Sequence, residues 1–134
     1  MPYDTQLSDD YMGTIHVGSG VVTGSEILEG CKTVTALVQT TANFYYKLID
    51  LSRASEVRIS PEEFEQILEQ DRLIAAQRPN DSVAIVAPND QIRAVAEEWR
   101  RQVDDLGWSI EIVPTREEAL AWIEEKMSGA QLQT

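Results

Sequence analysis

Four side chains of this sequence have the chemical character that catalysis or signalling could use, namely His16, Cys31, Asp50 and Ser60. A histidine can act as a general base, and a cysteine as a nucleophile. His16 and Cys31 are the single histidine and the single cysteine of the chain, so they cannot build a Cys/His metal site. No Gly-x-Ser-x-Gly nucleophile motif accompanies them. We therefore expect no catalytic residue, no metal site and no enzymatic activity.

Phosphate chemistry is not supported by the neighbouring residues either. A phosphoacceptor at Asp50 would need further carboxylates for Mg²⁺ and a lysine for the phosphoryl group. The other expected strands end in Gly18-Ser19-Gly20, Ala87-Pro88 and Val113-Pro114-Thr115, which supply none of these. Gly18-Ser19-Gly20 is also too short for a phosphate-binding P-loop. The sequence thus predicts no cofactor.

The surroundings of His16 and Cys31 indicate structural roles. His16 alternates with Ile15 and Val17 along a short strand pattern, so we expect it to face solvent. Cys31 lies in the apolar stripe of a helix that begins behind Thr23. We expect a buried and unreactive thiol there.

Composition restricts the partners of the chain. Its 134 residues include 23 acidic and 11 basic side chains, for a formal net charge of −12. Such a charge repels nucleic-acid backbones and anionic lipid, so we expect neither nucleic-acid binding nor membrane insertion. A single cysteine and an N-terminus without a secretion pattern favour a cytoplasmic location. Homo-oligomers are compatible with this composition.

The elements that must position these residues alternate between strands and helices. Aromatic and aliphatic runs predict strands, and three Ser/Thr-x-x-Glu capping boxes predict helix starts at Thr23, Ser60 and Thr115. The expected order is a strand around 14–17, a helix behind Thr23, a strand at 45–51, a helix at 60–77, a strand at 83–87, a helix from Asn89 to Leu106, an edge strand at 108–112 and a helix from Thr115 to Met127.

This alternation predicts an α/β fold, with a mixed and mostly parallel sheet of four to five strands and about four helices. The length fits one domain, which we place at residues 1–127. Residues 128–134 lack periodicity and are expected to form a flexible C-terminal tail.

Five segments between Met12 and Met127 resemble the SpoIIAA-like branch of the STAS (anti-sigma-factor antagonist) superfamily. They are SGVVTGSEIL, YKLIDLSRAS, SPEEFEQI, SVAIVAPND and EIVPTREEALAWI. The resemblance implies a mixed sheet packed with helices and a regulatory module without catalytic activity. It also implies protein partners, chiefly regulatory kinases, and for some members a link to nucleotides or lipids.

The same resemblance singles out Ser60. The best-known members are phosphorylated on a serine at the start of the helix that follows the central strand, within an Asp-Ser-Ser-Gly-like motif. The matching segment here is Arg58-Ile59-Ser60-Pro61, which lacks the acidic residue and the glycine. Ser60 is the serine to which phosphorylation would be carried over, and it is also the expected helix cap.

We expect function at the loop 52–59, between the strand at 45–51 and the helix at 60–77. Its arginines give local positive charge to an acidic protein, which suits an acidic segment of a partner. The alternative is a small-ligand carrier or sensor, for a lipid-like molecule or a nucleotide, with a cavity between helices and sheet. The predicted partner-binding residues are Ser52, Arg53, Ser55, Arg58, Ser60, Asn89 and Asp90.

Overall fold

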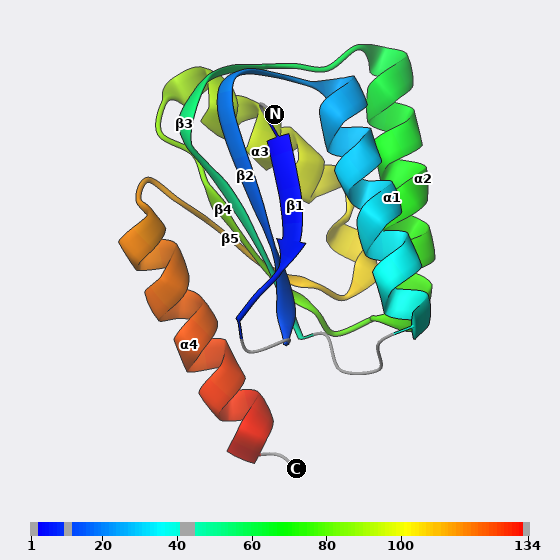
Figure 1. Cartoon of the computed structure of the whole chain (residues 1–134), viewed down its shortest axis with the longest axis vertical. Coiled ribbons are helices and arrows are strands. Elements are labelled where there is room, and N and C mark those ends of the chain that lie inside the picture. The colour runs from blue at the N-terminus through cyan, green and yellow to red at the C-terminus, as the bar shows by residue number, and fades with distance from the viewer. Residues whose placement is uncertain (1–2, 10–11, 41–44, 133–134) are drawn as a thin grey trace.

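The computed structural model describes residues 3–9, 12–40 and 45–132, with the side chains of 39–40 and 129–132 left out. Strands and helices alternate along the chain after an initial pair of strands (Figure 1). The elements are β1 (Tyr3–Leu7), β2 (Gly13–Thr23), α1 (Gly24–Thr40), β3 (Tyr46–Arg58), α2 (Pro61–Gln77), β4 (Ser82–Val86), α3 (Asp90–Gln102), a 3₁₀ turn (Asp104–Leu106), β5 (Ser109–Val113) and α4 (Arg116–Leu132).

The strands form one five-stranded sheet in the order β1-β2-β3-β4-β5. β1 is antiparallel to β2, and all other neighbouring pairs are parallel. Helices α1, α2 and α3 cover one face of the sheet, and α4 covers the other (Figure 1). The predicted mixed α/β sandwich is therefore confirmed, including the edge position of β5.

The core lies on both faces of the two central strands, β3 and β4. Leu48 pairs with Ala84 and Ile49 with Ile85 in the parallel ladder. Every residue of β4 is buried, as expected for a strand that helices cover on both faces. The predicted adjacency of these two strands is confirmed.

Helix starts follow the capping signals of the sequence. The Thr23 hydroxyl accepts a hydrogen bond from Glu26 N at 3.3 Å, and Glu26 Oε1 accepts one from Thr23 N at 3.0 Å. The Thr115 hydroxyl likewise accepts one from Glu118 N at 3.3 Å. Such caps satisfy N–H groups that the first turn of a helix leaves unpaired.

One predicted boundary differs from the structure. Helix α4 continues to Leu132, so the backbone of residues 128–132, which we expected to belong to a flexible tail, is helical. Residues 133–134 lie outside the described part of the chain.

Candidate functional site

The segment predicted as the functional loop is a strand. β3 continues to Arg58 because β2 continues beside it, and the two pair as far as Thr23 and Arg58. Ala54 and Val57 are buried in this second half, whereas Arg53, Ser55 and Arg58 are exposed. The loop prediction was wrong because the polar composition of residues 52–56 hid a partner strand distant in sequence.

The start of α3 closes the free edge of this part of β3. β4 pairs with β3 only as far as Asp50. Beyond that point, Asn89 Nδ2 donates to Ser55 O at 3.2 Å, while Gln91 accepts from Val57 N at 3.0 Å and donates to Val57 O at 2.8 Å. Two side-chain amides thus replace a neighbouring strand.

These contacts place Asn89 beside the 52–59 segment. Asn89 is also the N-cap of α3, where its Oδ1 accepts from Ile92 N at 2.9 Å. Asp90 follows as the first, exposed residue of the helix. The sequence analysis did not predict the role of Gln91. A glutamine in the first turn of a helix gives no sign in the sequence that its side chain will hydrogen-bond to the backbone of a strand.

Ser60 is held as a helix cap. Its Oγ accepts a hydrogen bond from Glu63 N at 3.1 Å, and Glu63 Oε1 accepts one from Ser60 N at 2.9 Å. Pro61 occupies the first position of α2, where a missing N–H costs nothing. The complete capping box confirms the structural role predicted for Ser60, while its phosphorylation stays a prediction.

Removing the Ser60 hydroxyl should therefore weaken the fold measurably. We expect Ser60→Ala to lower the free energy of unfolding by about 1 kcal/mol, because Glu63 N loses its acceptor. Urea denaturation followed by circular dichroism measures this change. Ser60→Asp, which keeps an acceptor at the cap, should stay within about 0.5 kcal/mol of wild type. Equal losses in both variants would show that the cap contributes little.

An open groove of about 820 Å³ lies where the end of β3 meets α2 and α3. Its floor is apolar and includes Val57, Phe64 and Val95, and polar side chains surround it. The other lining residues are Thr23, Arg58, Ile59, Ser60, Glu63, Gln91, Ala94 and Glu98.

The charge at this groove differs from the prediction. Arg58 Nε lies 2.6 Å from Glu56 Oε2, and hydrogen bonding between the two side chains raises the pKa of Arg58 and lowers that of Glu56. Glu63 and Glu98 also line the groove. The local positive charge expected from Arg58 is therefore offset by Glu56.

The predicted residues do not form one cluster. Five residue steps along β3 place Arg53 roughly 16 Å from Arg58, given the rise of a strand. Ser55 and Asn89 meet at the free edge of β3, while Arg58 and Ser60 line the groove. Ser52 and Arg53 are exposed on β3, away from the groove lining.

Asp50 has a structural partner that the sequence did not reveal. Its side chain is buried; Oδ1 accepts from Ser52 N at 2.9 Å, and Oδ2 lies 2.6 Å from Arg116 Nη1. Burial alone would raise the pKa of Asp50, but the hydrogen bonds from Ser52 and Arg116 together lower it. This ion pair fastens the start of α4 to the sheet.

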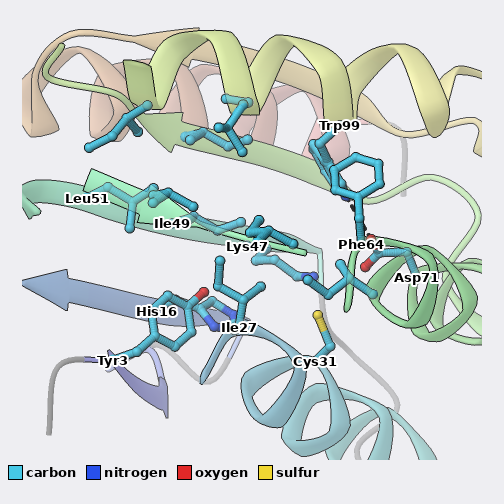
Figure 2. A pocket seen from close by; sticks show the side chains of 17 residues that line it. Tyr3, His16, Ile27, Cys31, Lys47, Ile49, Leu51, Phe64, Asp71 and Trp99 are labelled. Carbon is cyan, nitrogen blue, oxygen red and sulfur yellow. Dashed lines mark hydrogen bonds between the residues drawn. The ribbon is translucent and has the colours of Figure 1, made fainter. Parts of the chain in front are cut away.

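A second hollow, a cavity of about 80 Å³, lies between the sheet and helices α1 to α3 (Figure 2). Val57, Ile59, Phe64 and Val95 line both the cavity and the groove, so the two hollows lie next to each other. His16 also lines the cavity.

The solvent-facing position predicted for His16 was wrong, since only 2% of its surface is exposed. Its Nδ1 lies 3.0 Å from Thr5 Oγ1 and its Nε2 lies 3.1 Å from Thr14 Oγ1. α1 covers this face of β2, whereas α4 reaches mainly β3 to β5 and leaves Ile15 half-buried. Burial, reinforced by the positive charge of Lys47, lowers the pKa of His16 well below its ordinary value.

Cys31 is buried, as predicted. Burial, with a smaller effect of Asp71, raises the pKa of its thiol to about 12. A thiol with such a pKa holds almost no thiolate near neutral pH and is a poor nucleophile. Across the described ranges, no three His, Cys, Asp or Glu side chains gather where they could hold a metal ion. Nor is any helix there long and apolar enough to cross a membrane.

Comparison with solved structures identifies the class of fold. The chain is similar to the anti-sigma-factor antagonist SpoIIAA in its unphosphorylated form, with a TM-score of 0.60, 11% identity, and coverage of 91% of this chain and 97% of that one. It is also similar to an uncharacterised Shewanella loihica PV-4 protein with a SpoIIAA-like fold, with a TM-score of 0.57, 15% identity and 90% coverage of both chains.

The fold is therefore that of a SpoIIAA-like, STAS-like domain, as the sequence resemblance indicated. At these identities the likeness concerns the fold. No family model matches the sequence, and no curated protein matches it significantly.

Proposed function

We propose that this chain is a non-enzymatic regulatory module that binds a protein partner where β3 ends and α2 begins. The observation that carries the proposal is the open groove of about 820 Å³, which combines an apolar floor with exposed polar side chains on a SpoIIAA-like fold. Grooves of this kind accept apolar anchor residues of a partner, and their polar rims fix orientation.

The geometry also favours one mode of binding. Strand addition needs free N–H and C=O groups at a sheet edge. Asn89 and Gln91 already occupy such groups of Ser55 and Val57. A partner segment would therefore insert side chains between α2 and α3, near Phe64 and Val95, instead of extending the sheet.

We extend the proposed binding surface beyond the groove to the other residues predicted from the sequence. Arg58 and Ser60 touch the groove directly, and Asn89 and Asp90 begin the helix beside it. Ser52, Arg53 and Ser55 extend the surface along β3. A phosphate on Ser60 would sit at the positive end of α2 but close to Glu63, so its addition would change the charge of this surface.

Charge reversal tests whether this surface binds the partner. We expect the double variant Arg53→Glu and Arg58→Glu to lose at least tenfold in affinity for a partner that wild type captures from its source cell. The melting temperature should stay nearly unchanged, because exposed charges contribute little to stability. Capture with mass spectrometry identifies the partner, and titration of the purified pair measures the affinity.

A control variant with the same change in net charge separates the effect of this surface from the effect of net charge. Arg72→Glu with Lys126→Glu makes the same change in net charge on exposed sites of α2 and α4. This control should bind like wild type. If it loses binding while the Arg53/Arg58 variant retains it, the partner binds on another face of the molecule. Single variants then separate the groove residue Arg58 from Arg53 on β3.

A further inference from the structure

The edge strand β5 presents unpaired backbone groups. Among the described strands it ends the sheet on the side opposite β1, so one of its edges has no neighbouring strand (Figure 1). Toward β4, Ser109 N donates to Asp81 O at 3.0 Å. Because the backbone groups of successive residues point to opposite edges of a strand, the odd-numbered residues of β5 face β4. Ile110 and Ile112 therefore present their N–H and C=O groups to the free edge.

β5 lacks three features that commonly protect a sheet edge. Lysines, prolines and bulges on edge strands hinder pairing with a further strand. The five residues of β5, SIEIV, include neither lysine nor proline, and their register with β4 runs without a shift. All five are half-buried, so the strand remains accessible. The other edge strand, β1, exposes the polar side chains of Asp4 and Gln6, which makes β5 the edge more open to pairing.

The two faces of β5 differ in polarity. Ile110 and Ile112 pack, together with Trp108, against the core beneath α1 to α3. The opposite face, on the α4 side, carries Val113 and Glu111, the one charged residue of the strand. A strand added at this edge should therefore continue the apolar face and place no negative charge opposite Glu111.

We propose that β5 pairs with β5 of a second copy of this chain, antiparallel about a two-fold axis at Ile110, so that the two sheets become continuous. Ile110 then lies opposite the second copy's Ile110, and Ile112 lies opposite the second copy's Trp108. These positions turn their backbone groups outward, so each pair exchanges both of its N–H to C=O hydrogen bonds. On the other face, Glu111 lies opposite the uncharged Ser109 of the second copy.

The residues of β5 favour this register over its two neighbours. Pairing Ile110 with Ile112 would put the Glu111 side chains of the two copies directly opposite each other, and like charges there are destabilising. Pairing Ile112 with Ile112 would bring Ile110 opposite Pro114, which has no N–H to donate. The register centred on Ile110 avoids both costs. The edge is therefore complementary to itself, which is why the occupant that we assign is a second copy.

The proposed dimer should be weak and should respond to salt. One pair of short strands is a small interface, of the kind found in weak and transient association. Each copy carries a net charge of −12, and salt screens the repulsion between the copies. We expect a dissociation constant between about 1 μM and 1 mM, which falls as salt is added. Other elements line the groove near Arg58, so both copies would keep it open.

Analytical ultracentrifugation of the full chain, from about 10 μM to about 1 mM, tests the proposal. Wild type should pass from monomer toward dimer over this range. Ser109→Lys puts a cation opposite Glu111 of the second copy, twice by symmetry, and should tighten the dimer about 2- to 30-fold. Ser109→Glu should weaken it by a similar factor. Gln6→Lys and Gln6→Glu are the matched controls, because they make the same charge changes on the exposed side of β1 and should have much smaller effects.

Crosslinking through introduced cysteines tests the register. Ile110→Cys should form an intermolecular disulfide readily, because Cα atoms of a hydrogen-bonded pair lie about 5.5 Å apart, a separation that suits a disulfide. Ile112→Cys, on the same face but opposite Trp108, should crosslink far more slowly. The native Cys31 is buried. A chain that stays monomeric up to about 1 mM, a dimer that Ser109→Glu leaves unchanged, or crosslinking of Ile112→Cys that equals or exceeds that of Ile110→Cys would overturn the proposal.

Discussion

Replacing Ile85 with alanine should lower the free energy of unfolding by about 2–5 kcal/mol, the range for truncating a buried isoleucine. Ile85 is 4% exposed in the middle of β4 and pairs with Ile49 on β3 and Ile112 on β5. The paired backbones on both sides keep its surroundings from collapsing into the space that the side chain leaves. Guanidinium denaturation followed by circular dichroism gives the change directly.

An exposed leucine provides the control for this substitution. Leu73 lies on α2 with half of its surface exposed, so Leu73→Ala should change the free energy of unfolding by less than about 0.5 kcal/mol. If Ile85→Ala costs as little as this control, β4 is not the central strand of the core, and the arrangement of the sheet is wrong.

The sequence predicts the local parts of this fold well because their signals are local. Capping boxes at Thr23 and Ser60 need only a hydroxyl and a glutamate three residues later, and both are present in the structure. The continuous apolar run of β4 similarly predicts a strand covered on both faces. Each signal lies within the element that it predicts or directly beside it.

The errors concern residues whose environment is set by distant segments. Residues 52–58 form a strand because β2 pairs with them and because Gln91 satisfies Val57 on the other side. His16 is buried because α1 covers its face of β2. The sequence of residues 52–58 does not show how far β2 extends beside them. The sequence around His16 does not show which face of β2 is covered by α1.

The two hollows illustrate the same limit. The sequence predicts function at the end of the central strand, a common site for function in parallel sheets, but it predicts neither the groove there nor the Glu56–Arg58 pair. Lys47 carried one signal, a lysine inside an aliphatic run that predicts a buried strand. That signal marks Lys47 as an unusual residue. It does not predict the cavity, because the cavity is formed by elements that are distant in sequence.

A single carboxylate near the core should make stability depend on pH. Asp81 precedes β4 and is 8% exposed. Burial raises the pKa of its carboxyl group to about 6, although Arg78 and Lys47 oppose the rise. We expect Asp81→Asn, which keeps the shape and removes the charge, to stabilise the protein by up to about 3 kcal/mol at roughly pH 7.5, from a rise of about two pKa units.

The sign follows from proton binding. The folded state holds the proton of Asp81 more tightly than the unfolded state does, so this group favours folding most below its unfolded pKa, near 4. That contribution is lost as the pH rises through about 6. The gain from Asp81→Asn should therefore be near zero below about pH 3 and reach its full size above about pH 7.

Urea denaturation of both proteins across this range measures the difference. Asp50, Glu56 and Glu98 have lowered pKa values and act in the opposite sense at low pH, but they are present in both proteins and cancel. Asp105→Asn, at an exposed site on the 3₁₀ turn, should leave the pH profile of wild type unchanged. A difference between wild type and Asp81→Asn that is constant with pH, or a loss of stability in this variant near neutral pH, would mean that the Asp81 carboxylate is well solvated in the folded protein.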